Sequence, residues 1–225
     1  MATRGKGDYA GKGRGSQART RLARRAVVDA ARALFLERGY VATTIDAISD
    51  RADVPAATVY RLFSSKLGIL HALLDASIAG DDEPIPVQQR PHVAALFAES
   101  DPDKLLADFV SIAVAINARS NDIYRILTSA SVSDPAAAEL FADYQRQRAQ
   151  GQGRVARALV RARALRSGVR EREAADIIHA LVSPELYRLL VVDRRWSHAR
   201  YEKWLVSTLT AQLTSDTATP QTPRR

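Results

Sequence analysis

Apolar residues recur three and four positions apart along most of the chain, a spacing typical of helices. A first helix is predicted from Arg19 to Arg38, with Gly39 placed where a helix commonly ends. Residues 66–79 and 105–116 carry further apolar stripes at the same spacing, and a shorter one covers 123–130. The pattern therefore predicts an all-α protein.

Three more helices are expected in the second half of the chain. One runs from about 134 to 166, and a glycine pair beginning at Gly151 should weaken or bend its middle. The next spans about 171–192, is apolar on a broad face and should kink at Pro184. The last covers about 197–213.

Composition shifts divide the chain into five parts. Residues 1–18 are basic and glycine-rich, which predicts a disordered tail. A small helical domain follows over 19–79, and the proline-rich stretch 80–102 is expected to be a linker. Residues 103–214 should form a larger helical domain, and 215–225 a frayed tail.

Within the small domain, two short helices around a tight turn are predicted, an arrangement that can place a helix in the DNA major groove. Thr43 stands three residues before Asp46, which indicates a helix start with Thr43 as its cap. Asp53 tolerates the turn, and Pro55 suits the first turn of the next helix. The second helix is therefore predicted from Pro55 to Phe63.

This second helix offers groups suited to DNA on its outward face. Its small first residues would let the backbone approach base edges, and Thr58 can bond a base or touch a thymine methyl. Tyr60, Arg61 and Lys66 are better suited to phosphates. The alternative is that Tyr60 is a core aromatic residue and Thr58 an ordinary solvated one.

At these residues the chain resembles the tetracycline-repressor (TetR) family of bacterial transcriptional regulators, over about residues 19–78. The positions that carry the resemblance share the family's residue types and spacing: Ala30, Leu34, Phe35, Gly39, Tyr40, Thr43, Thr44, Ile48, Ala52, Val54, Thr58, Val59, Tyr60, Phe63, Ser65, Lys66 and Leu70. Asp53 departs from the glycine usual in the turn. Gly68 departs from the usual helix-favouring residue and should loosen its helix by about 1 kcal/mol relative to alanine.

The resemblance implies a helix-turn-helix domain that binds DNA, followed by a larger helical domain. It assigns phosphate contacts to Thr44, Tyr60 and Lys66, and it places Ala56, Ala57, Thr58 and Arg61 toward the groove. The full expected DNA-binding set is Thr43, Thr44, Pro55, Ala56, Ala57, Thr58, Tyr60, Arg61 and Lys66.

The resemblance also implies a ligand-responsive homodimer, more often a repressor than an activator, on an inverted-repeat operator. Residues about 134–166 and 172–192 are the expected dimer helices, although their apolar width would also fit burial within one subunit. A small-molecule effector would bind between the helices of the larger domain. Five residues can line such a cavity or be ordinary core and surface residues: Phe109, Asn117, Tyr124, His179 and Tyr187.

Charge and composition change this picture mainly at the N-terminus. Residues 1–25 hold eight Lys/Arg and one Asp, a net of +7, against +8 for the whole chain. The tail is therefore read either as an arm that adds phosphate contacts or as a solubilising leader. An alternative function follows from the first reading, namely a non-specific or architectural nucleic-acid-binding protein that uses the tail.

The remaining composition argues against other classes of protein. The chain has no cysteine, its four histidines lack paired metal spacing, and it has no phosphate loop or nucleophile elbow. We therefore expect no enzyme activity, no metal and no cofactor. With no apolar segment of about 20 residues and no secretory signal, a cytoplasmic protein without membrane contact is expected.

Overall fold

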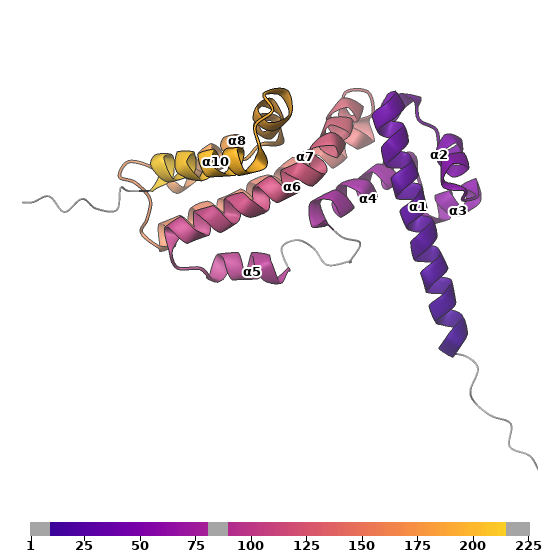
Figure 1. The fold of residues 1–225 in the computed structure, drawn as a ribbon, viewed down its shortest axis with the longest axis horizontal. Helices are drawn as coiled ribbons and strands as arrows, with labels where there is room; N and C mark the ends of the chain where they lie inside the picture. Colours follow the sequence, from indigo (N-terminus) through magenta and orange to yellow (C-terminus); the bar gives the residue numbers. More distant parts are fainter. Residues whose placement is uncertain (1–9, 81–89, 215–225) are drawn as a thin grey trace, which may run out of the picture. The chain divides into compact units, whose positions relative to one another are not determined.

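A computed structural model of the protein describes residues 10–80 and 90–214, and these residues form an all-helical structure (Figure 1). The prediction of an all-α fold is confirmed. The helices, in chain order, are α1 (Ala10–Ala42), α2 (Ile45–Ala52), α3 (Ala56–Phe63), α4 (Lys66–Ala79), α5 (Pro91–Ala98), α6 (Pro102–Ser131), α7 (Pro135–Arg161), α8 (Glu171–Leu181), α9 (Pro184–Tyr187), a short π-helix (Arg188–Asp193) and α10 (His198–Leu213).

The helix ends agree with the sequence signals in most places and differ at the N-terminus. α1 begins at Ala10, nine residues before the helix start predicted at Arg19. Its regular course ends at Gly39, whose φ of 79° is in the left-handed region that glycine adopts most easily. The parts of the expected tails and linker at 1–9, 81–89 and 215–225 lie outside the described residues.

Two predicted irregularities in the second half have different outcomes. α7 runs without a break through Gly151 and ends at Arg161, five residues earlier than expected. At Pro184 the predicted kink is a full break, because Val182 ends α8 and Ser183 caps α9 by accepting the backbone N–H of Leu186.

The residues pack as two units whose limits do not follow the expected linker. Among the described residues, the first unit comprises 10–75 together with 125–138, and the second comprises 76–80, 90–124 and 139–214. The physical reason lies in the α6–α7 turn, where Asp134 accepts a hydrogen bond from the Tyr40 hydroxyl at the end of α1. The first unit contains the two short helices α2 and α3, and we call it the head. It is therefore built from two separate stretches of chain.

The core of the first unit consists of the apolar positions that the helical spacing selects. α1 contributes residues such as Val27 and Leu34, α2 contributes Ile48, and α3 contributes Val59, all nearly or fully buried. Burial of side chains of this size stabilises a fold by roughly 1.5–3 kcal/mol each. This core fixes α3 with one face inward, which leaves its other face for contacts outside the head.

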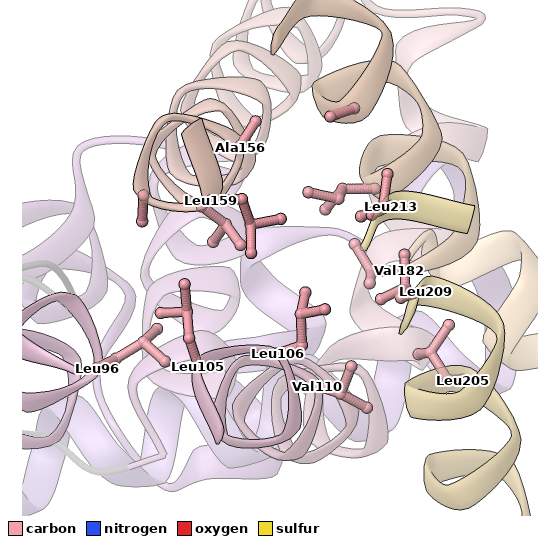
Figure 2. Close-up of a cluster of buried hydrophobic side chains, with 14 of the residues drawn as sticks. Leu96, Leu105, Leu106, Val110, Ala156, Leu159, Val182, Leu205, Leu209 and Leu213 are labelled. Atoms are coloured by element: carbon pink, nitrogen blue, oxygen red, sulfur yellow. The ribbon is translucent and has the colours of Figure 1, made fainter. Parts of the chain in front are cut away.

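The core of the second unit collects side chains from the six helices α5 to α10. Part of this cluster is drawn in Figure 2. It includes Leu96 of α5, Leu106 of α6, Leu159 of α7, Val182 at the end of α8 and Leu209 of α10. The broad apolar face predicted for 172–192 is therefore used in part within the chain itself.

Among the helices of the described segments, none is by itself long and apolar enough to cross a membrane. Helices α3 and α4 reach that length and composition only as a pair, and they are bent by 62° relative to each other.

Candidate nucleic-acid interface

The turn between α2 and α3 is closed by local hydrogen bonds. Asp53 adopts the left-handed conformation, with φ 51° and ψ 43°, which short polar side chains tolerate better than others. The Ser49 hydroxyl donates to the carbonyl of Val54 at 2.7 Å, and the Val54 N–H donates to the carbonyl of Ser49 at 3.2 Å. Although Asp53 replaces the glycine usual in this turn, its backbone adopts the left-handed conformation that a glycine would adopt.

Helix α3 separates its buried and exposed residues as predicted. Val59 and Phe63 face the core, while Tyr60 is 53% exposed, so it is not a core aromatic residue. Ala57 and Arg61 are also exposed. The remaining groove residues stand at or near the start of the same helix: Pro55, which is exposed, and Ala56 and Thr58, which are half-buried.

Thr43, one of the residues predicted to contact DNA, is buried in the structure. Its side chain is 1% exposed, and its hydroxyl donates to the carbonyl of Gly39 at 2.8 Å, with the carbonyl of Leu34 at 3.3 Å. The capping role predicted for Thr43 belongs to Thr44, whose hydroxyl oxygen accepts the N–H of Ala47 at 3.1 Å. Thr43 therefore holds the end of α1. Of the two threonines, Thr44 is the one exposed to solvent.

These two neighbouring threonines should respond differently to the same substitution. Thr43→Val leaves the two carbonyls without their donor and should lower the free energy of unfolding by roughly 1–2 kcal/mol, with DNA affinity of the folded protein unchanged. Thr44→Val removes a helix cap, which costs about 1 kcal/mol, and should also weaken DNA binding. Urea unfolding and DNA titration of both variants test this pair. Weaker DNA binding by a fully stable Thr43→Val variant would contradict the assignment.

Lys66, which was expected to contact phosphate, is directed toward the backbone of its own domain. Its ammonium donates to the carbonyls of Tyr40 and Thr43, both at 2.8 Å, and lies 3.4 Å from the carbonyl of Val41. It also lies 4.3 Å from the centre of the Tyr40 ring, within the range of a cation–π interaction. Lys66 therefore joins the start of α4 to the segment between α1 and α2.

Asp134 completes this arrangement with both of its carboxylate oxygens. Oδ1 accepts the N–H of Ala136 at 3.0 Å at the start of α7, and Oδ2 accepts the Tyr40 hydroxyl at 3.2 Å. Burial, followed by the negative charge of Asp134, raises the pKa of Tyr40 to about 12. Tyr40 and Asp134 were missed as a pair because 94 residues separate them in the sequence.

Two arginines link α1 and α2 to their neighbours in the head, and sequence reasoning missed both. Arg24 of α1 lies 4.6 Å from the centre of the Phe63 ring at the end of α3. Arg51 of α2 pairs with Glu37 of α1 at 2.6 Å, and this contact holds the pKa of the Glu37 carboxyl below its usual value. Both contacts fix the helices behind the exposed face of α3.

In the second unit, Tyr124 belongs to a cluster of aromatic and charged side chains. Its ring lies 5.8 Å from both the Phe141 and Tyr144 rings, and its hydroxyl donates to the Glu185 carboxylate. Burial and this hydrogen bond raise the pKa of Tyr124. Beside Tyr144, the Nη2 atom of Arg148 is buried and has no hydrogen-bond partner among the described residues.

His179 lies within reach of the same charges. Its Nδ1 is 2.5 Å from Oε1 of Gln152, and because that oxygen only accepts, we assign the proton to Nδ1. Burial and the positive charge of Arg148 lower the pKa of His179, so the ring is neutral near pH 7. The charges of Arg148 and Glu185 act on both His179 and Tyr124, so these two predicted residues share one electrostatic environment.

The other three predicted effector residues have structural partners. The Asn117 amide donates to the carbonyl of Val182 at 3.2 Å, which satisfies the backbone where α8 ends. The Tyr187 hydroxyl lies 2.8 Å from Nε2 of His198, and Phe109 packs against the core of the second unit.

Two short helices joined by a tight turn, with one exposed face on the second helix, define a helix-turn-helix DNA-binding protein. Residues 27–73 match the family described as "Bacterial regulatory proteins, tetR family". The helix-turn-helix domain is therefore of the TetR type, which identifies the chain as a transcriptional regulator similar to that family.

Relatives and solved structures agree with this assignment. The chain is 25% identical over 169 residues to an uncharacterized HTH-type transcriptional regulator, YdeS, of Bacillus subtilis, covering 74% of this chain and 78% of that protein. NalD, the secondary repressor of the MexAB-OprM multidrug efflux pump in Pseudomonas aeruginosa, has a TM-score of 0.65 at 23% identity, over 86% of this chain and 97% of that one. A putative transcriptional regulator from Saccharomonospora viridis in complex with choline has a TM-score of 0.65 at 20% identity, over 86% and 98%. The two structural likenesses show the fold.

Proposed function

We propose that this protein is a repressor that binds an inverted-repeat operator as a homodimer and is released by a small-molecule effector. The observation that carries the proposal is the outward face of α3, where Tyr60 and Arg61 are exposed while Val59 and Phe63 hold the helix in the core. An exposed hydroxyl and an exposed guanidinium on one helix face are groups that bind phosphates and base edges, so this face supports DNA binding.

The roles within this face follow from reach and chemistry. Thr44 and Tyr60 would contact phosphates, which fix the register of α3 on the duplex. The residues toward the groove would be those at the start and middle of the helix: Pro55, Ala56, Ala57, Thr58 and Arg61. Arg61 can donate two hydrogen bonds to one guanine, the commonest specific contact in the major groove.

A dimer is required if two heads are to read one inverted repeat, because successive major-groove faces lie about 34 Å apart. We place its interface within residues 134–166 and 172–192. Part of the apolar face of α8 is buried in the chain's own core, so those residues are not available for the dimer interface. Leu189 and Val192 of the π-helix, 51% and 53% exposed, remain available for a second subunit.

The proposed effector would act on the helices of the second unit. Support comes from the cluster of Tyr124, Tyr144 and Arg148, and from the choline complex of the Saccharomonospora regulator. An effector that favours the non-binding state by about 1–3 kcal/mol would lower DNA affinity about 5- to 150-fold.

The test is selection of DNA from a random-sequence pool by the purified protein, followed by footprinting at about 150 mM salt with excess competitor. We expect an inverted repeat, bound by two chains as measured by light scattering. Tyr60→Ala and Arg61→Ala should each weaken the footprint strongly, while Lys203→Ala, at an exposed lysine on α10, should leave it unchanged.

Deletion of residues 1–18 separates the repressor from the architectural alternative. A repressor should lose some affinity and keep its preferred sequence, because base contacts come from α3. A protein that binds through its basic tail should lose nearly all binding and should select no sequence in the first experiment.

A further inference from the structure

A hollow of about 340 Å³ lies between α5 and α7, and its lining is almost entirely cationic. Phe97 of α5 forms one wall, and Arg154, Arg157 and Arg161 of α7 form the other. We refer to these four residues as the arginine hollow. Its volume is within the range of pockets that hold small organic molecules.

The three arginines stand on one face of their helix. With 3.6 residues per turn, positions three and seven residues apart point in nearly the same direction, and the three span about 10 Å along the axis. Like charges at such spacing repel each other. The hollow therefore concentrates positive charge over two turns.

Carboxylates of the protein compensate this charge poorly. Arg157 lies 3.9 Å from the carboxylate of Glu171, at the outer limit of an ion pair. Within residues 10–80 and 90–214, no ion pair is formed by Arg154 or Arg161. Donors of both side chains are thus available to an anion.

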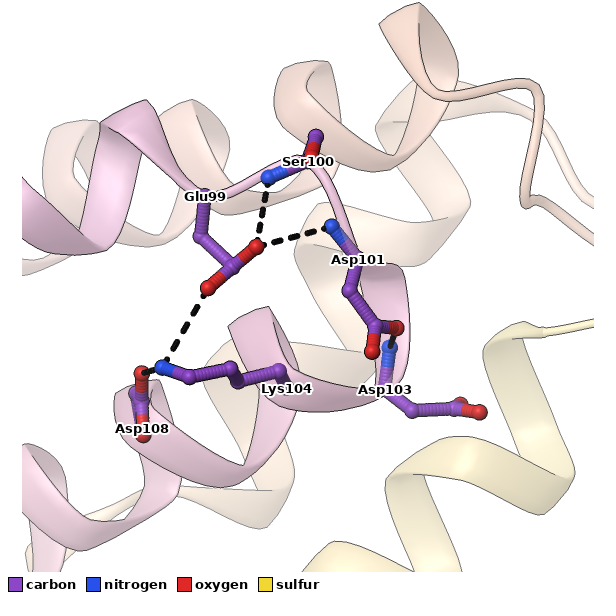
Figure 3. A network of polar contacts seen from close by, with 6 residues as sticks. All are labelled: Glu99, Ser100, Asp101, Asp103, Lys104 and Asp108. Carbon is purple, nitrogen blue, oxygen red and sulfur yellow. Dashed lines mark hydrogen bonds and ion pairs between the residues drawn. The ribbon is translucent and has the colours of Figure 1, made fainter.

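The apolar wall of the hollow is held in place. The Arg154 guanidinium lies 4.0 Å from the centre of the Phe97 ring, which fixes both side chains. The end of α5 is anchored by Glu99, whose carboxylate accepts the N–H groups of Ser100 and Asp101 at 2.8 and 3.0 Å and pairs with Lys104 at 3.2 Å (Figure 3). Phe97 therefore presents a positioned ring beside the arginines.

We propose that the arginine hollow binds a small organic dianion, either a phosphate ester or a dicarboxylate, that carries a flat apolar group. The charged oxygens would accept hydrogen bonds from Arg157 and Arg161, which suit such groups because a guanidinium offers paired donors. The flat apolar group would lie against the guanidinium of Arg154, which is stacked on Phe97. This site is independent of DNA binding and of the cluster around Tyr124.

Titration calorimetry of the full-length protein tests the proposal with two probes at low ionic strength and about pH 8, where a phosphate ester is a dianion. Phenyl phosphate represents the phosphate esters, isophthalate represents the dicarboxylates, and benzyl alcohol is the uncharged control. We expect saturable binding of one or both anions at one site per chain and none of benzyl alcohol. Absence of saturable binding of both anions up to about 10 mM would overturn the proposal.

Matched variants locate the site. Arg157→Gln and Arg161→Gln should each weaken binding about tenfold or more, because each removes charge-assisted hydrogen bonds. Arg146→Gln, on the same helix but outside the hollow and paired with Asp143, should change it less than about twofold. Equal losses in all three variants would show non-specific attraction to a basic surface and would overturn the site.

Discussion

Replacing Gly68 with alanine is expected to destabilise the protein by about 2 kcal/mol, although alanine is the better helix former. A Cβ atom at this position would lie 2.0 Å from the carbonyl oxygen of Phe63, a distance that forces the backbone to move. Overpacking of this kind costs roughly 1–3 kcal/mol or more, whereas the helix-forming gain of alanine is only about 1 kcal/mol. The clash therefore dominates, and urea unfolding of the full-length variant measures the balance.

Gly151 provides the matched control for this prediction. It also lies inside a helix, but nothing stands within 4 Å of the position its Cβ would take. Gly151→Ala should therefore stabilise the protein by about 0.5–1 kcal/mol. A Gly68→Ala protein as stable as the wild type would contradict the prediction, because it would mean that the Phe63 carbonyl can move away without cost.

Lys66→Met should lower the free energy of unfolding by roughly 2–4 kcal/mol, because the carbonyls of Tyr40 and Thr43 lose a charged donor. The methionine side chain keeps most of the apolar contact of the lysine, so the decrease in the free energy of unfolding measures the contribution of the ammonium group. We expect operator affinity to fall as well, because the segment leading into α2 is no longer held. Unfolding by urea and DNA titration at several salt concentrations provide the two measurements.

The salt dependence separates this structural role from the phosphate contact that the family resemblance implies. A lost phosphate contact lowers the slope of log affinity against log salt by about 0.9 and leaves stability unchanged. If Lys66 instead holds the backbone of the head, Lys66→Met should lower stability and leave the salt slope unchanged. Arg61→Met is the control, since it removes one exposed charge from the same domain and should weaken DNA binding without changing the unfolding curve.

Most of the helices were predictable because their signals are local. The apolar spacing before Gly39, the turn at Asp53 and the break at Pro184 each depend on residues within a few positions of one another. The start of α1 was missed because the glycines and charges of residues 10–18 carry no apolar stripe, which is the primary sequence signal of a helix.

The head's polar contacts were less predictable, since they join distant residues. Thr43 and Thr44 are adjacent and chemically identical, so only the packing decides that the first is buried and the second caps α2. Lys66 reaches back 26 residues to the carbonyl of Tyr40, and Tyr40 reaches forward 94 residues to Asp134. No periodicity encodes such separations. Exposed α3 residues were predicted because one amphipathic helix contains the whole pattern.

The discontinuous first unit has a practical consequence for building hybrid regulators from this protein. A transplant that ends at residue 80 would carry the recognition helix but leave behind residues 125–138, and with them the carboxylate that holds Tyr40. The graft would then meet a foreign α6–α7 turn at the place where its own turn belongs. Exchange of DNA-binding domains between relatives should therefore transfer both stretches of chain together.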